Sequence, residues 1–133
     1  MSADSVVYLD SSAIVKLVVE EDESSALLHH LVARPVRASS ALARVEVVRA
    51  VQPHGTPAIN RARQVLNAMH LLAIDQALLD AAADLRQTSL RSLDAIHVAS
   101  ALALAADLSE LVTYDQRMSA AATAAGLTVS GPG

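Results

Sequence analysis

Short apolar runs alternate with helix-forming segments along the whole sequence, and this alternation constrains the fold more than any other feature. Runs typical of buried strands occupy residues 6–9, 36–38, 71–74, 111–113 and 127–129. Helical patterns lie between them, at 12–19, 24–34, 40–51, 57–69, 75–86, 92–106 and 115–125. Strands that alternate with helices need crossover connections, which produce a mostly parallel sheet covered on both faces. The sequence predicts an α/β fold, a three-layer α/β/α sandwich, as a single domain over residues 1–133.

Composition limits the kinds of core and functional site that this domain can have. Hydrophobic residues make up 53% of the sequence, but it has no Phe or Trp and only two Tyr, so we expect an aliphatic core. The absence of Cys excludes disulfides, thiolate metal ligands and a Cys nucleophile. The start of the sequence lacks a basic segment, and no apolar run approaches the length of a membrane span. We therefore expect a cytoplasmic protein.

Four carboxylates interrupt otherwise apolar segments near the expected strand ends and helix starts. Asp10 follows the first strand, Asp115 lies just past the fourth, Glu46 lies within the third helical segment, and Asp94 lies in the first turn of a later helix. Each has a simpler explanation by itself, because Asp10 and Asp115 would suit N-caps, Glu46 could pair with Arg49, and the helix dipole favours Asp94. Ligands of open α/β sheets bind outside the carboxyl ends of the strands, where these residues are expected.

Clustered carboxylates at such an edge would repel one another unless a cation joined them. A divalent metal would keep all four ionised, and oxygen-only ligands suit Mg²⁺ or Mn²⁺ better than zinc. Metal ions held there could activate a water for in-line attack on a phosphodiester. Asp10, Glu46, Asp94 and Asp115 are thus the candidate catalytic and metal-binding residues, and the hydroxyls of Ser11, Ser12 and Thr113 are candidates for orienting them.

Four segments carry a resemblance to a known family. The runs "VVYLDSSAIVKL", "SSALARVEVVRA", "LRSLDAIHVASAL" and "LVTYDQRM" occur in this order in a chain of 133 residues. Together they resemble the PIN-domain family, and specifically the VapC-type toxins of toxin-antitoxin pairs. The similarity spans nearly the whole chain, with Ser11 where Thr is common. The segment 52–90 has no recognisable motif, and substrate choice could depend on it.

This resemblance implies both an activity and partners. The acidic quartet of the family would fall on Asp10, Glu46, Asp94 and Asp115, and the activity would be that of a magnesium- or manganese-dependent endoribonuclease acting on RNA. A cognate VapB-like antitoxin would inhibit it by occupying the site, in a homodimer or a toxin-antitoxin hetero-oligomer. An antitoxin tail could lie in an apolar groove beside the site, with Ile14, Leu17 and Val18 as candidate walls.

Other functions remain open from the sequence alone. A non-catalytic module could keep the same fold and act only through a partner. The net charge of −4 also argues against a protein that holds nucleic acid by a broad basic surface, although bound metal ions would offset it. Four of the five His residues are expected to be solvated. His97 is the only one near the motifs, and a hydrogen bond to its helical neighbour Asp94 would explain it.

Overall fold

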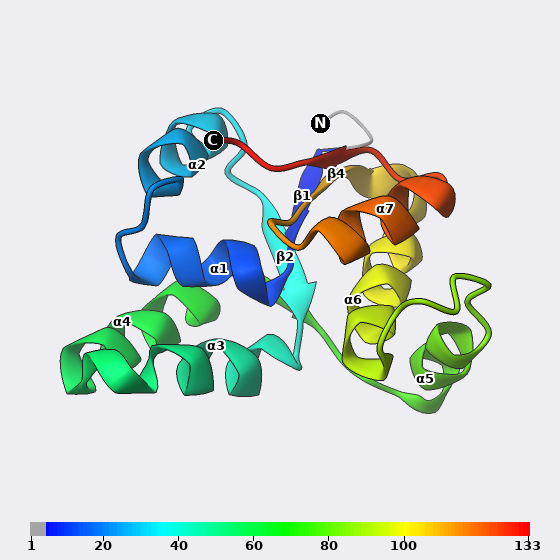
Figure 1. Cartoon of the computed structure of the whole chain (residues 1–133), viewed down its shortest axis with the longest axis horizontal. Helices are drawn as coiled ribbons and strands as arrows, with labels where there is room; N and C mark the ends of the chain where they lie inside the picture. Colours follow the sequence, from blue (N-terminus) through cyan, green and yellow to red (C-terminus); the bar gives the residue numbers. More distant parts are fainter. Residues whose placement is uncertain (1–4) are drawn as a thin grey trace.

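A single parallel sheet organises the molecule. The computed structural model describes residues 5–133, and within them five strands pair in the order β3-β2-β1-β4-β5, every pair parallel. The predicted three-layer sandwich is confirmed (Figure 1). The strands are β1 (Val6–Leu9), β2 (Arg37–Ser40), β3 (His70–Leu72), β4 (Leu108–Val112) and β5 (Val129–Ser130).

Helices connect the strands and cover both faces of the sheet. Figure 1 shows α1 to α4 on one side and α5, α6 and α7 on the other. The α-helices are α1 (Ser11–Val18), α2 (Ser24–Leu31), α3 (Ala43–Val51), α4 (Thr56–Asn67), α5 (Gln76–Ala83), α6 (Ser92–Ala103) and α7 (Gln116–Ala124). Two short 3₁₀ helices, η1 (Gln52–His54) and η2 (Ala105–Asp107), follow α3 and α6. No helix among residues 5–133 has the length and apolar character needed to cross a membrane.

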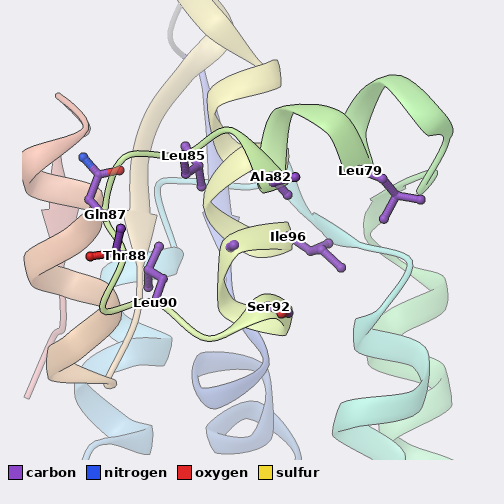
Figure 2. A pocket seen from close by; sticks show the side chains of 10 residues that line it. Leu79, Ala82, Leu85, Gln87, Thr88, Leu90, Ser92 and Ile96 are labelled. Atoms are coloured by element: carbon purple, nitrogen blue, oxygen red, sulfur yellow. The ribbon is translucent and has the colours of Figure 1, made fainter.

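The face under α6 and α7 carries the smaller of the two cores that cover the sheet. Tyr8, Leu111 and Val98 are fully buried there. The helix α5 packs mainly on α6, in a small separate cluster. Between α5, α6 and the loop that joins them lies a cavity of about 380 Å³, lined mainly by apolar side chains such as Leu79, Leu85, Leu90 and Ile96 (Figure 2).

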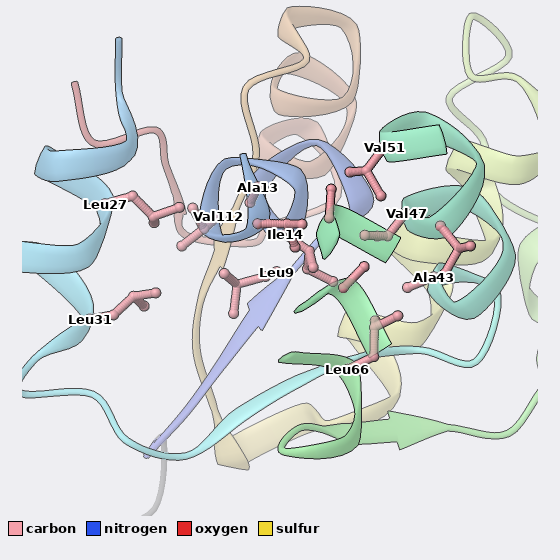
Figure 3. Packing of buried hydrophobic residues seen from close by; sticks show 14 of the residues in the cluster. Leu9, Ala13, Ile14, Leu27, Leu31, Ala43, Val47, Val51, Leu66 and Val112 are labelled. Carbon is pink, nitrogen blue, oxygen red and sulfur yellow. The ribbon is translucent and has the colours of Figure 1, made fainter. Parts of the chain in front are cut away.

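The face under α1 to α4 carries the larger core. Val7 and Leu9 point to this side of β1 while Tyr8 points to the other, as the two-residue period of a strand requires. Ile14 and Leu27, both completely buried, pack over them, together with Val47 and Leu66 from the next two helices (Figure 3). Ile14 is thus a core residue and cannot form the wall of an open groove.

Strand limits differ from the predicted ones where polar residues are buried. β2 runs two residues further than expected, because Ser39 and Ser40 pair with β3 at zero exposure, and α3 consequently begins at Ala43 rather than at Ser40. β4 begins at Leu108, three residues earlier than expected. Glu110 interrupts the apolar pattern of this strand, pairs with β1 and forms a hydrogen bond with His30. His30 is therefore only partly exposed, rather than solvated as expected.

Candidate active site

Asp10 lies where β1 ends and α1 begins, and it is almost completely buried, with 2% of its surface exposed. It is the N-cap of α1: its Oδ1 accepts hydrogen bonds from the Ala13 backbone N–H at 3.0 Å and the Ser12 hydroxyl at 2.6 Å. The Thr113 hydroxyl donates to Oδ2 at 2.5 Å. Burial raises the pKa of Asp10, and these hydrogen bonds only partly offset the effect.

Asp10 and Thr113 sit at the topological switch point of the sheet. From the central strand β1 the chain runs outward to β2 and β3 on one side and to β4 and β5 on the other, so the crevice opens between β1 and β4. Thr113 follows β4, and its hydroxyl accepts from the Asp115 N–H at 3.1 Å. The Ser12 hydroxyl accepts from the Tyr114 N–H at 3.1 Å, which ties the two strand ends together.

Glu46 comes from the first turn of α3 and has a different set of partners. Its Oε1 accepts from the Ser11 hydroxyl and from His97 Nε2, each at 2.7 Å. Burial acts to raise the pKa of Glu46, but the hydrogen bonds from His97 and Ser11 and the charge of His97 outweigh it, and the pKa is lowered. The ion pair with Arg49 that the spacing suggested is not among the salt bridges of residues 5–133.

Asp94 and Asp115 occupy the rim of the same edge, both half-buried. Asp94 lies in the first turn of α6, as predicted, and Asp115 is the N-cap of α7, accepting from the N–H groups of Arg117 and Met118. Partial burial raises the pKa of Asp94, and the negative charges of Asp115 and Glu46 raise it further. The fold therefore brings these carboxylates near enough to repel one another.

The donor chemistry of this edge fits a hard divalent cation, because every candidate ligand is a carboxylate oxygen. Across residues 5–133, however, no three acidic or histidine side chains form a group arranged to hold a metal ion. Asp10 has both oxygens engaged in hydrogen bonds, and Glu46 has one. Metal coordination by Asp10, Glu46, Asp94 and Asp115 thus stays a prediction.

Two residues of this edge were not expected from the sequence. His97, in α6, is buried, and it contacts Glu46 rather than its helical neighbour Asp94. Its Nδ1 lies 2.7 Å from the hydroxyl of Tyr8, a residue predicted only as part of β1. The one sequence signal was the position of His97 one turn after Asp94. The three hydroxyl residues Ser11, Ser12 and Thr113 do contact the carboxylates as the sequence suggested.

Comparison with known proteins identifies the family. The sequence model of the PIN domain matches residues 7–124, which is most of the chain. The chain belongs to the PIN-domain family. This PIN domain is 50% identical over 126 residues to Ribonuclease VapC46 of Mycobacterium tuberculosis, covering 95% of this chain and 97% of that protein. It is 42% identical over 135 residues to Ribonuclease VapC35 of the same species, covering 96% and 98%. The predicted VapC-type family is confirmed.

Solved structures agree on the fold. VapC20 of Mycobacterium tuberculosis, described as a sarcin-ricin loop cleaving toxin, superposes with a TM-score of 0.74 at 17% identity and covers 95% of this PIN domain and 99% of that chain. A toxin-antitoxin complex from Klebsiella pneumoniae gives a TM-score of 0.68 at 24% identity, covering 83% and 87%. At these identities the likeness concerns the architecture alone.

Proposed function

We propose that this PIN domain is a Mg²⁺- or Mn²⁺-dependent endoribonuclease and the toxin of a toxin-antitoxin pair. The observation that carries the proposal is the 50% identity, along almost the whole chain, to a protein named as a ribonuclease. Fold alone would not be enough, because one fold hosts many functions. The acidic edge at the switch point of the sheet supplies the chemistry that such an activity needs.

In this proposal Asp10, Glu46 and Asp94 hold the metal, directly or through water, and Asp115 completes the site. A bound divalent ion supplies Lewis acidity, which favours ionisation of a water and offsets charge on the leaving oxygen of a phosphodiester. The protein's own contribution is to hold the carboxylates: Ser12 and Thr113 fix Asp10, and Ser11 and His97 fix Glu46. Fixed ligands have less freedom to lose when the ion binds.

RNA needs positive charge beside this edge, and two exposed arginines are placed to supply it. Arg91 is the N-cap residue of α6, and its charge acts to lower the pKa of Asp94. Arg117 lies in the first turn of α7, next to the Asp115 cap. We assign these two side chains to RNA phosphates, with which guanidinium groups form bidentate hydrogen bonds.

An apolar groove near the starts of β2 and β3, away from the acidic edge, suits part of an antitoxin tail. A hollow of about 400 Å³ between α1, α2 and α4 is lined by Leu17, Leu28, Val65 and Met69, among others. Leu28 is 55% exposed, unusual for a large apolar side chain. A tail that fills this groove and also extends to the acidic edge, with an Arg against the carboxylates, would compete with metal and RNA.

Incubation of the purified chain with a single-stranded RNA tests the nuclease activity. We expect cleavage with Mg²⁺ or Mn²⁺ and none in EDTA, and we expect the Asp10→Asn protein, purified in the same way, to be inactive. Equal cleavage by both proteins would indicate a contaminating ribonuclease. No cleavage of any RNA by the wild-type chain, with tight binding to a partner protein retained, would favour the non-catalytic module.

Co-expression with the neighbouring reading frame tests the toxin-antitoxin assignment. Affinity purification at high salt should recover a small partner bound to this PIN domain, and the complex should be inactive until the partner is removed. Leu28→Glu, which puts a charge in the groove, should weaken the complex and leave cleavage unchanged. Recovery of the chain alone, with activity unaffected by the neighbour, would contradict the toxin-antitoxin assignment but not the nuclease.

A further inference from the structure

His97 is buried in a place where an imidazole needs partners for both ring nitrogens. It lies in the second turn of α6 with only 1% of its surface exposed. A buried polar group without a hydrogen bond costs stability, so a histidine at such a position is either fully paired or destabilising. Here each nitrogen has its own partner, on a different element of the fold.

The two partners assign the ring proton. A carboxylate can only accept, so the 2.7 Å contact between His97 Nε2 and Glu46 Oε1 places a proton on Nε2. In the neutral ring Nδ1 is then an acceptor, and the Tyr8 hydroxyl at 2.7 Å is positioned to donate to it. We call Tyr8, His97 and Glu46 the histidine bridge. It runs from the central strand through α6 to α3, across 89 and 51 residues of sequence.

The histidine bridge leaves one oxygen of Glu46 available. The Ser11 hydroxyl and His97 both donate to Oε1, while Oε2 accepts no hydrogen bond from residues 5–133. Two donors on one oxygen fix the rotation of the carboxylate, and the other oxygen is left for a ligand. A histidine retained only for core packing would not need a carboxylate at the sheet edge as its partner.

We propose that His97 is a positioning residue, which orients Glu46 toward the divalent metal, and that the Tyr8 hydroxyl selects the ring tautomer that makes this possible. The inference rests on the proposed function, because it gives Glu46 the role of a metal ligand. His97 touches neither the metal nor RNA in this scheme. It acts through Glu46, in the way that outer hydrogen-bond partners orient ligands in metal sites.

Four variants separate positioning from packing. His97→Leu fills the space and removes both hydrogen bonds, whereas His97→Gln can donate to Glu46 and accept from Tyr8. Tyr8→Phe keeps the buried ring and removes only the hydroxyl. Val98→Ala is the matched control, because Val98 is the next residue of α6, is fully buried and belongs to a core cluster without Glu46. It loosens the same helix and the cluster that contains Tyr8, but it leaves every hydrogen bond of the bridge in place.

The first measurement is Mn²⁺ affinity without RNA, by calorimetry, alongside melting temperature. We expect His97→Leu to bind Mn²⁺ about 10–100-fold more weakly than the wild type, the usual range for outer-partner losses. His97→Gln should stay within about threefold, and Tyr8→Phe should fall between them. Val98→Ala should melt earlier but bind Mn²⁺ normally. Wild-type affinity in a folded His97→Leu protein, or an equal loss in His97→Gln, would overturn the proposal.

The second measurement needs no metal and separates this inference from the proposed function. Nitrogen chemical shifts of the His97 ring, measured by NMR in EDTA, should show the proton on Nε2, and Tyr8→Phe should move the Nδ1 resonance. A proton on Nδ1 would overturn the bridge even in an active nuclease. If the wild-type chain binds no Mn²⁺ and cleaves RNA in EDTA, the proposed metal chemistry is wrong, and with it the positioning role of His97, whatever the tautomer.

Discussion

Asp10 and Glu46 are two carboxylates at the same sheet edge, and the fold shifts their pKa values in opposite directions. Asp10 is buried among neutral donors, namely two hydroxyls and a backbone N–H, and its pKa is raised. Burial also acts to raise the pKa of Glu46, but a histidine beside it reverses the direction. Hydrogen-bond number therefore does not decide ionisation here. The difference is that Asp10 is more deeply buried and that Glu46 accepts a hydrogen bond from His97, and environments that separate neighbouring carboxyl groups in this way are typical of active sites.

The difference also shows in what each residue does for the fold. Asp10 caps α1 and accepts a hydrogen bond from Thr113 at the end of β4. It therefore helps to hold the ends of β1 and β4 together. Glu46 lies in the first turn of α3, where it caps no backbone N–H and its negative charge only suits the helix dipole. A buried carboxylate with a raised pKa is costly to keep ionised, so the fold supports Asp10 for a reason other than stability.

The largest effect we expect is loss of cleavage in Asp10→Asn. Asn keeps the cap on Ala13 and can donate to Thr113, but it removes the charge that a metal requires. RNA cleavage should fall on the order of 10³-fold or more, which corresponds to about 4 kcal/mol of activation free energy. The comparison is with Asp75→Asn, the same change at the exposed N-cap of α5. Equal activity in both variants would show that Asp10 serves only as the N-cap of α1.

A smaller effect is expected for Thr113→Val, which changes the shape of the side chain little. It removes the only hydrogen bond to Asp10 Oδ2 from residues 5–133 and also the acceptor of the Asp115 N–H. Cleavage should fall about 10–100-fold, and the free energy of unfolding by about 1–3 kcal/mol. Thr123→Val on the exposed side of α7 is the control for the substitution itself. Unchanged activity would show that Asp10 needs no support at Oδ2.

Ser11→Ala makes the corresponding change on the Glu46 side and should cost less. It removes one of the two donors to Oε1, but His97 remains and still holds the carboxylate. We expect less than about a tenfold loss of cleavage, below the usual range for outer partners. Steady-state cleavage rates of the two variants, measured together, test the asymmetry. A Ser11→Ala loss as large as that of Thr113→Val would mean that His97 adds little.

The fold and the positions of the four acids within it could be predicted from the sequence, because both depend on local patterns. Apolar runs of strand length mark β1, and a carboxylate directly after such a run marks Asp10 at the strand end. The parallel sheet then follows from the alternation of strands and helices. β4 was predicted short because its inner polar residues, Ser109 and Glu110, find partners on β1, α2 and β5 that no local pattern reveals.

The histidine bridge could not be predicted in the same way. Its contacts join residues far apart in the sequence, and the tertiary fold alone brings them together. Local reasoning paired His97 with Asp94, three residues away in the same helix, because that is the contact a helix offers by itself. In the fold, the buried His97 ring contacts Tyr8 of β1 and Glu46 of α3 instead. Contacts between residues far apart in the chain are the feature that a single sequence predicts least well.

The smallest effect we expect is a gain of stability in Asp10→Asn, and it follows from the sign of the pKa shift. The folded protein holds a proton on Asp10 more tightly than the unfolded chain does, so this residue lowers stability as the pH rises through its raised pKa. Below the ordinary pKa of Asp, about 4, both states are protonated and the penalty is absent. Asn never ionises, and the variant therefore avoids the penalty at every pH.

Urea unfolding in EDTA at several pH values measures this difference. At pH 7 Asp10→Asn should be more stable than the wild type by on the order of 1 kcal/mol, or about 4 °C in melting temperature. The gain should shrink as the pH falls and disappear below about pH 4. Asp75→Asn should show no such trend, since its cap is exposed. A gain that persists unchanged at low pH would contradict the prediction, because it would have to come from packing and not from the ionisation of Asp10.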